Sequence, residues 1–374
     1  TGTDGGFEGS IDNVSVKEYL GQEVVPNSGC GSWLWEPQST NLITQSELFS
    51  DASWNKSRST YTGDAIKSPS GLINMGYLTE DTTATNTHYM RTFLTLTDGV
   101  DYTLSVFAKA KERNIICLGD NAAAQSNTGV WFDLTNGVVL TQRSGYVGSI
   151  KDFGNGIYRC SVIYSAAASR QYADIAISLS DGVNVYTGDG TSGVYIWGAM
   201  LEENNISSYI PTSGSTVTRN QDLCTNGGSL ATINSTEGVL YAEIAALSDD
   251  LSFRSISLND GTNTNSVGIR YRTNSNRVNA IIKDGNGVNL QMNVDISDIT
   301  QFNKIALKYK SGDVSMYING TEVATNSLSF SFTAALNDLS FDRGDSNDNF
   351  FGKTKALAVF PYLSDSELQS LTTI

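Results

Sequence analysis

Short stretches in which apolar and polar residues alternate are the feature that most constrains the fold of this chain. In DYTLSVFAKA (101–110) and YRCSVIYSA (158–166) every second residue is apolar or aromatic. That period places one face of a β-strand in a core. Similar stretches recur along the chain, and Gly and Asn separate them. With 35 Gly and only 5 Pro in 374 residues, the pattern predicts an all-β protein of many short strands.

The strand-like stretches form two series. One covers residues 41–219 and the other residues 237–374, which predicts tandem antiparallel β-sandwiches. The small-residue stretch 220–236 between them is expected to be a linker. One short helix is predicted at the end of the chain, because Ser364 and Glu367 form a capping box. Three dipeptides favour tight hairpins that need positive φ: Asn136-Gly137, Asn155-Gly156 and Asn319-Gly320.

The start of the chain repeats the end of the first sandwich. Residues 9–29 and residues 193–214 each combine an apolar strand, acidic residues, a polar connector and Pro-x-Ser-Gly. We therefore expect residues 1–29 to be the closing strand and tail of a preceding jelly-roll module, followed by a connector over residues 30–40. On this interpretation the chain is the C-terminal part of a longer protein.

Charge and composition argue against two classes of partner. The formal net charge is -15 and the pI is about 4.4, whereas binding to a phosphate backbone is driven by Lys and Arg. No stretch of about 18 apolar residues suggests a membrane span. We expect neither nucleic-acid binding nor membrane insertion.

The four cysteines lack the paired spacing of a zinc site. Cys117 and Cys160 lie in strand-like stretches and are predicted to be buried free thiols. Cys30 and Cys224 lie in polar loops on either side of the first sandwich, and whether they form a disulfide stays open.

The sequence also resembles known families. TNLITQSELFSDASWNKS, GNGIYRCSV and SSYIPTSGSTVTRNQD make residues 41–219 similar to the carbohydrate-binding-module-like jelly rolls of bacteriophage fibre proteins. LKYKSGDVSMYING and YLSDSELQSL make residues 237–374 similar to the concanavalin A-like, laminin G-like lectin sandwich. The combination resembles a bacteriophage tail or head fibre, or another virion appendage. It implies a location on the virion surface, contact with other virion proteins and assembly as a homo-oligomer.

The resemblance implies little metal binding. Carbohydrate-binding jelly rolls often use an Asp of the closing strand for structural calcium, and Trp197 stands at that place in this chain. The residues themselves offer one candidate calcium loop, FDRGDSNDNF, because carboxylates are hard oxygen ligands. Its carboxylates are Asp342, Asp345 and Asp348. No other cofactor is expected.

Catalytic residues are not evident. His88 is the only histidine, and no nucleophile motif accompanies it. Glu243 stands alone on its strand, whereas glycosidases need a pair of carboxylates. We therefore expect a protein without enzymatic activity.

Sugar binding would use exposed aromatic rings together with polar or charged side chains. Candidates for ring stacking in the first sandwich are Trp131, Tyr61, Tyr146 and Tyr172. In the second sandwich, Arg270 and Arg272 are candidates for contact with a sulfated or uronic glycan. They belong to a locally basic stretch that also contains Arg254, Arg277 and Lys283.

These features favour a virion surface protein that attaches to host or environmental glycans. Two alternatives stay open. One is a structural decoration or interaction protein of the virion that binds no sugar, and the other is a secreted bacterial adhesin or an accessory binding region of a polysaccharide-degrading enzyme.

Overall fold

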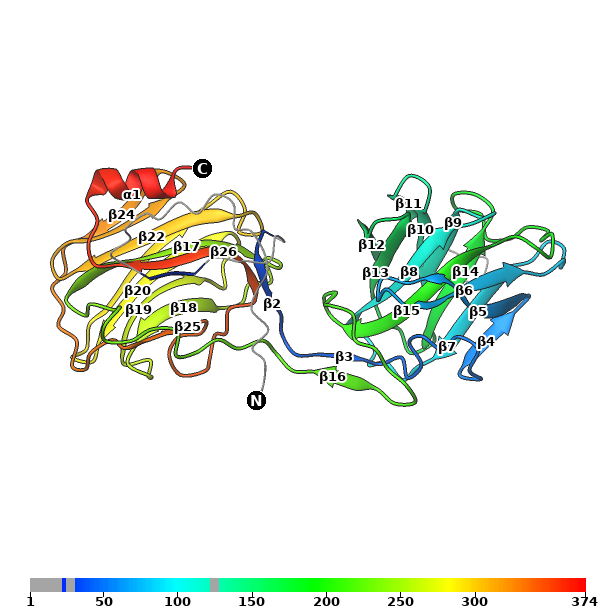
Figure 1. Cartoon of the computed structure of the whole chain (residues 1–374), viewed down its shortest axis with the longest axis horizontal. Helices are drawn as coiled ribbons and strands as arrows, with labels where there is room; N and C mark the ends of the chain where they lie inside the picture. The colour runs from blue at the N-terminus through cyan, green and yellow to red at the C-terminus, as the bar shows by residue number, and fades with distance from the viewer. Residues whose placement is uncertain (1–21, 25–30, 122–127) are drawn as a thin grey trace, which may run out of the picture. The chain divides into compact units, whose positions relative to one another are not determined.

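A computed structural model describes residues 22–24, 31–121 and 128–374 (Figure 1). The chain forms two compact units. The inserted unit is Pro37–Gln221, and the split unit comprises the chain up to Glu36 together with Asp222–Ile374. Both units are antiparallel β-sandwiches, as the alternating pattern predicts.

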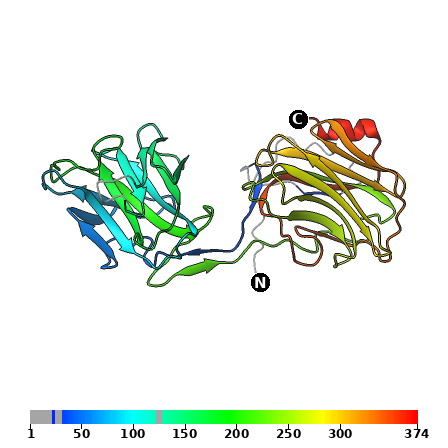
Figure 2. The same ribbon diagram turned by 180° about the vertical axis from the view of Figure 1, so that it is seen from behind.

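The inserted unit consists of two six-stranded sheets, with strand orders β11-β10-β9-β14-β7-β4 and β12-β13-β8-β15-β6-β5. Their inner faces enclose an apolar core in which Leu104, Val106, Phe132 and Ile175 are fully buried, and both layers are visible in Figure 2. A separate pair, β3 and β16, joins the two ends of the unit. The strands are β3 (Ser39–Asn41), β4 (Trp54–Ser57), β5 (Ser59–Lys67), β6 (Ile73–Glu80), β7 (His88–Phe93), β8 (Asp101–Ala110), β9 (Ile115–Gly119), β10 (Val130–Asp133), β11 (Val138–Gln142), β12 (Tyr146–Asp152), β13 (Ile157–Ser165), β14 (Tyr172–Ser178), β15 (Gly193–Glu203) and β16 (Val217–Arg219).

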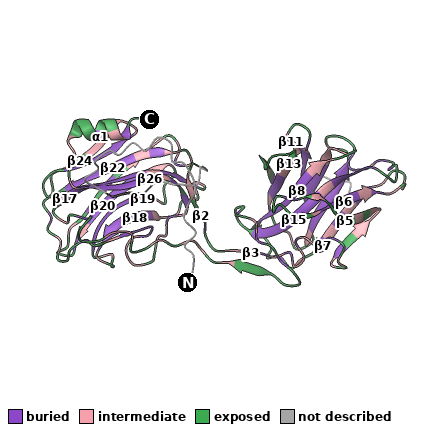
Figure 3. Cartoon of the chain, viewed as in Figure 1, coloured by how far each residue is buried: buried purple, intermediate pink, exposed green. Residues whose placement is uncertain are grey.

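The split unit has one sheet in the order β1-β26-β17-β22-β23-β24, with β2 also paired to β26, and a second sheet in the order β21-β20-β19-β18-β25. Buried residues follow the strands of both sheets (Figure 3). Helix α1 (Asp365–Thr372) closes the chain; among the described residues no helix is long and apolar enough to cross a membrane. The strands are β1 (Gln22–Val24), β2 (Trp33–Trp35), β17 (Glu237–Ala246), β18 (Arg254–Asn259), β19 (Asn265–Tyr271), β20 (Arg277–Asp284), β21 (Asn289–Asp295), β22 (Asn303–Lys310), β23 (Val314–Ile318), β24 (Thr321–Asn326), β25 (Asp338–Ser340) and β26 (Gly352–Phe360).

Residues that precede the inserted unit complete the split unit. Strand β26 pairs with β17 along one side. Along its other side it pairs with β1 and β2. The Trp35 ring stacks on Phe341 with a centroid distance of 4.3 Å and packs against the core of the split unit. Strands that precede the inserted unit in the sequence thus pair with β26, which follows it.

This pairing corrects the predicted boundaries. The connector expected over residues 30–40 contains β2, and residues 22–24, expected in the tail of a preceding module, pair with β26. The linker expected over residues 220–236 follows β25, because Gly227 N donates to Leu339 O and Phe341 N donates to Cys224 O, both at 2.9 Å. The predicted closing strand over residues 9–19 lies outside the described residues.

Local predictions fare better. Positive φ is observed at Gly137 and at both residues of Asn155-Gly156 and Asn319-Gly320. The capping box of α1 is present, with Ser364 N donating to Glu367 Oε2 at 2.8 Å. Cys117 and Cys160 are buried free thiols, as predicted, and burial raises the pKa of Cys117 to about 12. Cys224 is also a free thiol in the structure, while Cys30 lies outside the described residues.

We predict that Trp35→Ala destabilises the split unit by about 2 kcal/mol, less than the roughly 3–5 kcal/mol for a fully buried aromatic residue, because Trp35 is only half-buried. Hydrogen exchange in denaturant measures the free energy of opening of each unit. Amides of strands β17 to β26 report on the split unit, and amides of strands β4 to β15 report on the inserted unit. Leu34→Ala is the control, since Leu34 lies on the same strand but is 44% exposed. Equal losses in both units, or no loss in the split unit, would contradict the assignment of β2.

Candidate functional site: a basic sheet face

Arg270, Arg277 and Lys283 of the predicted basic stretch lie on the outer face of the sheet β21-β20-β19-β18-β25, and Arg272 follows β19 in the same alternation, whereas Arg254 shares the inward alternation of Ile256 and Leu258. Ile269 and Tyr271 of β19 are buried in the core of the split unit, so the alternation of the strand places Arg270 outward. On β20, Val278, Ala280 and Ile282 point inward, which places Asn279 and Lys283 on the same outer face as Arg270. Arg270 and Asn279 are direct cross-strand partners.

The five basic side chains of the stretch differ in their partners. Arg254 pairs with Asp250 at 2.8 Å, and Arg277 forms two bonds with Asp295, at 2.6 and 2.9 Å. Among the described residues, the side chains of the other three form hydrogen bonds only with neutral amide oxygens. Arg270 Nε donates to Asn279 Oδ1 at 2.6 Å, Arg272 Nη1 to Gln291 Oε1 at 2.8 Å, and Lys283 Nζ to Asn263 Oδ1 at 2.8 Å.

We name Arg270, Arg272 and Lys283 the basic face. Within the described parts of the chain, none of these three side chains has a carboxylate close enough to form an ion pair. Arg270 and Arg272 converge on one acceptor, because Arg270 Nη2 also lies 3.3 Å from Gln291 Oε1. Both guanidinium groups lie 5.2 Å from the ring centroid of Phe253. Two guanidinium groups that share one acceptor could equally donate to an acidic oxygen at that position.

The cations of the basic face act on one another. Burial lowers the pKa of Arg270, and the nearby Arg272 and Arg343 lower it further, while Asp348 opposes the shift. Burial also lowers the pKa of Lys283, and Arg270 and Arg343 add to that effect. Like charges held together at a half-buried surface favour the binding of an anion.

The loop after β25 flanks the basic face. Gly344 has φ +96°, and a Cβ atom there would lie 2.4 Å from Thr262 O, so only glycine lets the loop lie against the β18–β19 hairpin. Arg343 of this loop pairs with Asp345, with Nε 2.8 Å from Oδ1. The loop is thereby fixed close to Arg270 and Lys283.

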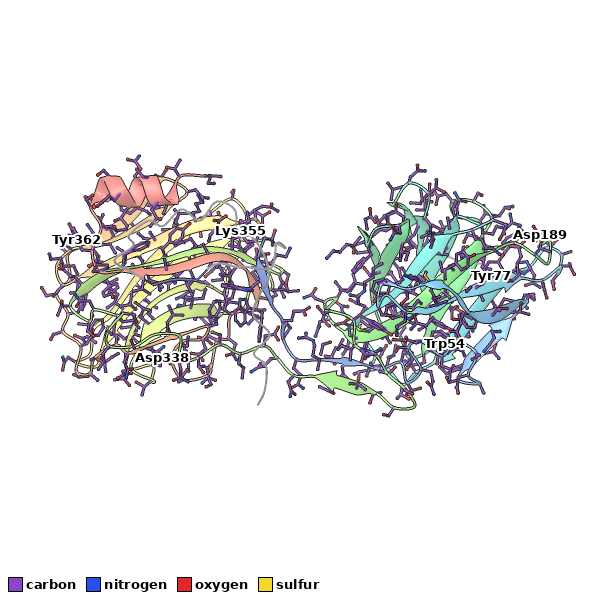
Figure 4. All side chains as sticks on the ribbon, viewed as in Figure 1. Trp54, Tyr77, Asp189, Asp338, Lys355 and Tyr362 are labelled. Atoms are coloured by element: carbon purple, nitrogen blue, oxygen red, sulfur yellow. The ribbon has the colours of Figure 1, made fainter. Side chains whose placement is uncertain are left out.

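The structure does not assemble the candidate calcium loop. Asp342 is buried and accepts hydrogen bonds from Ser340 Oγ and Gly344 N, whereas Asp345 and Asp348 both contact Arg343. Within the ranges that the structure describes, no three His, Cys, Asp or Glu side chains are placed to hold a metal ion. Asp338 of β25, the strand that leads into this loop (Figure 4), has its pKa raised by burial and, to a smaller extent, by Asp342.

Two of the aromatic candidates are not available for stacking. Trp131 lies on the outer face of its sheet with Cys117 and Ala176, but it is only 2% exposed: Asn184 accepts its Nε1–H at 2.8 Å and Arg143 covers its ring. Tyr146 points into the core, and its hydroxyl donates to Asp120 Oδ1 at 2.6 Å.

The other two aromatic candidates differ from each other. Tyr61 is half-buried against Phe49, at a centroid distance of 5.4 Å, and burial is the main cause that raises its pKa to about 12. Tyr172 lies at the surface beside Phe93. All four rings belong to the inserted unit.

The residues considered for catalysis have structural partners. His88 of the inserted unit is buried, with Nδ1 2.8 Å from Arg58 O. Glu243 of β17 pairs with Lys355 at 3.3 Å, on the other sheet of the split unit. Sequence analysis missed Phe253, Asn279 and Gln291. The alternation of β20 and β21 places the two amides on the outer face, and only tertiary structure places Phe253.

Comparisons with known proteins add little. No family model and no curated protein matches the chain. Among solved structures, domains LG4-5 of the mouse laminin alpha1 chain are similar, with 10% identity over 75% of this chain and 86% of that chain and a TM-score of 0.27. A similarity at that level supports no inference about function.

We predict that Arg270→Ala raises the pKa of Lys283, because a neighbouring positive charge that disfavours the ammonium form is removed. NMR titration of the Lys283 side chain measures the shift. Arg277→Ala is the control, since Asp295 already neutralises that guanidinium. An unchanged or lowered pKa in Arg270→Ala would show that the cations of the basic face do not interact.

Proposed function

We propose that the split unit is a non-enzymatic binding module whose basic face attaches to an acidic glycan. The observation that carries the proposal is the difference in partners: Arg270, Arg272 and Lys283 contact amides, whereas Arg254 and Arg277 pair with carboxylates. Charged groups held without counter-charges at a surface are suited to a ligand that supplies them.

The chemistry of the basic face fits carboxylated or sulfated sugars. An Arg guanidinium binds such groups with paired hydrogen bonds, and Gln291 Oε1 marks the position where an acidic oxygen would meet Arg270 and Arg272 together. Asn279 offers an amide to sugar hydroxyls beside them. Because the chain as a whole carries a charge of -15, an acidic polymer is repelled elsewhere and is directed to this face.

For the biological setting, we propose a surface protein of a bacteriophage virion, on a tail or head fibre or another appendage. The support is the resemblance of residues 41–219 to the jelly rolls of such proteins, in combination with a module, residues 237–374, that resembles a concanavalin A-like lectin sandwich. A symmetric particle presents many copies, so that weak single sites add up to firm attachment. Assembly as a homo-oligomer beside other virion proteins, with host or environmental glycans as ligands, belongs to the same proposal.

The proposed binding is tested with immobilised alginate, a polyuronate, and dextran sulfate. We expect Arg270→Ala/Arg272→Ala to weaken binding of the full chain at least tenfold. Each lost charge-assisted bond is worth about 1.5–3 kcal/mol, and about 1.4 kcal/mol corresponds to tenfold. Binding of the unaltered protein should weaken as salt rises.

Arg277→Ala is the matched control, because it removes one positive charge from the same sheet face but leaves the basic face intact. It should bind within about twofold of the unaltered protein. The proposal is wrong if the unaltered protein binds neither polymer, or if Arg277→Ala loses as much affinity as the double variant.

A further inference from the structure

The loop over residues 342–349 lies along one side of the basic face, and we name it the flanking loop. Its backbone is hydrogen-bonded to β18, because Ser255 N donates to Asp348 O at 2.8 Å. Ser255 is the direct cross-strand partner of Arg270. Ser257 Oγ of the same strand donates to the carbonyl oxygen of the first loop residue, also at 2.8 Å. Contacts between loop backbone oxygens and β18 therefore hold the loop beside Arg270, whatever charge its side chains carry.

The flanking loop brings two carboxylates to the surface beside the basic face. Its one cation, Arg343, is neutralised within the loop: it forms two bonds with Asp345, at 2.8 and 3.0 Å, and lies 3.5 Å from Asp348. The side chains of Asp345 and Asp348 are 31% and 18% exposed. Among the described residues, neither carboxylate lies within ion-pair distance of a cation of the basic face. Two carboxylates thus share one arginine, which leaves this side of the face with net negative charge.

The two carboxylates act on the basic face at longer range. Burial, the main cause, lowers the pKa of Arg270, and Asp348 opposes that shift. Burial also lowers the pKa of Lys283, where both Asp345 and Asp348 oppose the shift. A carboxylate that stabilises a cation at this range also repels an anion that approaches the same cation. The flanking loop therefore limits how much negative charge the basic face accepts.

We propose that the flanking loop makes the basic face discriminate against densely charged polymers in favour of glycans with one acidic group per sugar. The inference rests on the proposed function, because it concerns the ligand of the same face. A single acidic oxygen at the position of Gln291 Oε1 meets Arg270 and Arg272. A densely sulfated polymer brings further anions to the edge of the face, where Asp345 and Asp348 repel them. Repulsion built against an unsuitable ligand is a source of specificity.

The test compares two ligands of the full chain at one ionic strength: alginate, with one carboxylate per sugar, and dextran sulfate, with more than one sulfate per sugar. The readout is the ratio of their dissociation constants. We expect Asp345→Asn/Asp348→Asn to strengthen binding to dextran sulfate about tenfold and binding to alginate by no more than about threefold. The reason is that the removed charges face the additional sulfates.

Asp348→Asn alone separates repulsion by a carboxylate from release of an arginine, because it leaves the pair of Arg343 with Asp345 intact. It should change the ratio in the same direction, by about threefold. Asn also tolerates the φ of +55° that Asp348 adopts. This single variant keeps the test decisive if the double variant does not fold, which circular dichroism melts detect.

Asp313→Asn/Asp365→Asn is the matched control. These two carboxylates also share one cation, Lys308 Nζ, at 3.1 and 2.9 Å, but they lie on the other sheet of the split unit. The control makes the same change in net charge and should leave the ratio within about twofold of that of the unaltered protein.

The inference is overturned if the folded Asp348→Asn and Asp345→Asn/Asp348→Asn variants keep the ratio of the unaltered protein. It is also overturned if the control on the other sheet shifts the ratio as much as they do. In both cases binding of the unaltered protein would still support the proposed function. If the unaltered protein binds neither polymer, the proposed function fails and this inference fails with it.

Discussion

Strand β26 is hydrogen-bonded to β17 and also to β1 and β2, and the organisation of the whole chain depends on this pairing. Because β1 and β2 precede Pro37, the split unit is complete only when both of its segments are present. The inserted unit must then begin and end close together. It does so through Glu36 N, which donates to Asp222 Oδ2 at 2.9 Å, and through the pairing of β3 with β16. Neighbouring chain ends are what allow one domain to be inserted in another.

The strands and the final helix could be predicted because their signals are local. Alternation identifies β8, β13 and β20 directly, and the capping box locates α1. The insertion could not be predicted in this way. Strand β2 is only three residues long, too short for a periodic signal, and its partner is more than three hundred positions away in the sequence. The small residues over 220–236 suggested a linker because nothing local shows that they follow β25.

The candidate sites show the same limit. Alternation correctly places Arg270 and Trp131 on outer faces, but it does not show what covers a face. Arg143 and Asn184 cover Trp131, so that ring is lost as a ligand contact. Likewise, five basic residues look equivalent in the sequence. Only the structure distinguishes those paired with Asp250 and Asp295 from those that contact amides. Which cations lack a counter-charge is a property of tertiary contacts.

Both units place an arginine on an outer sheet face, but the cross-strand partner of that arginine differs. In both, a sheet face that points away from the core carries an arginine among polar and aromatic neighbours. In the inserted unit a fully buried Asp174 neutralises Arg91, whereas in the split unit Arg270 faces Asn279. This exchange of a carboxylate for an amide at the cross-strand position decides whether the arginine at that position is neutralised.

If the proposed function is correct, the basic face, and not basic charge in general, binds the acidic ligand. The most direct measurement is the NMR signal of each arginine Nε–H while alginate is added to the full chain. The account predicts that the signals of Arg270 and Arg272 shift with added alginate while those of Arg254 and Arg277 stay in place. Equal shifts at all four arginines, or no shift at Arg270 and Arg272, would contradict it.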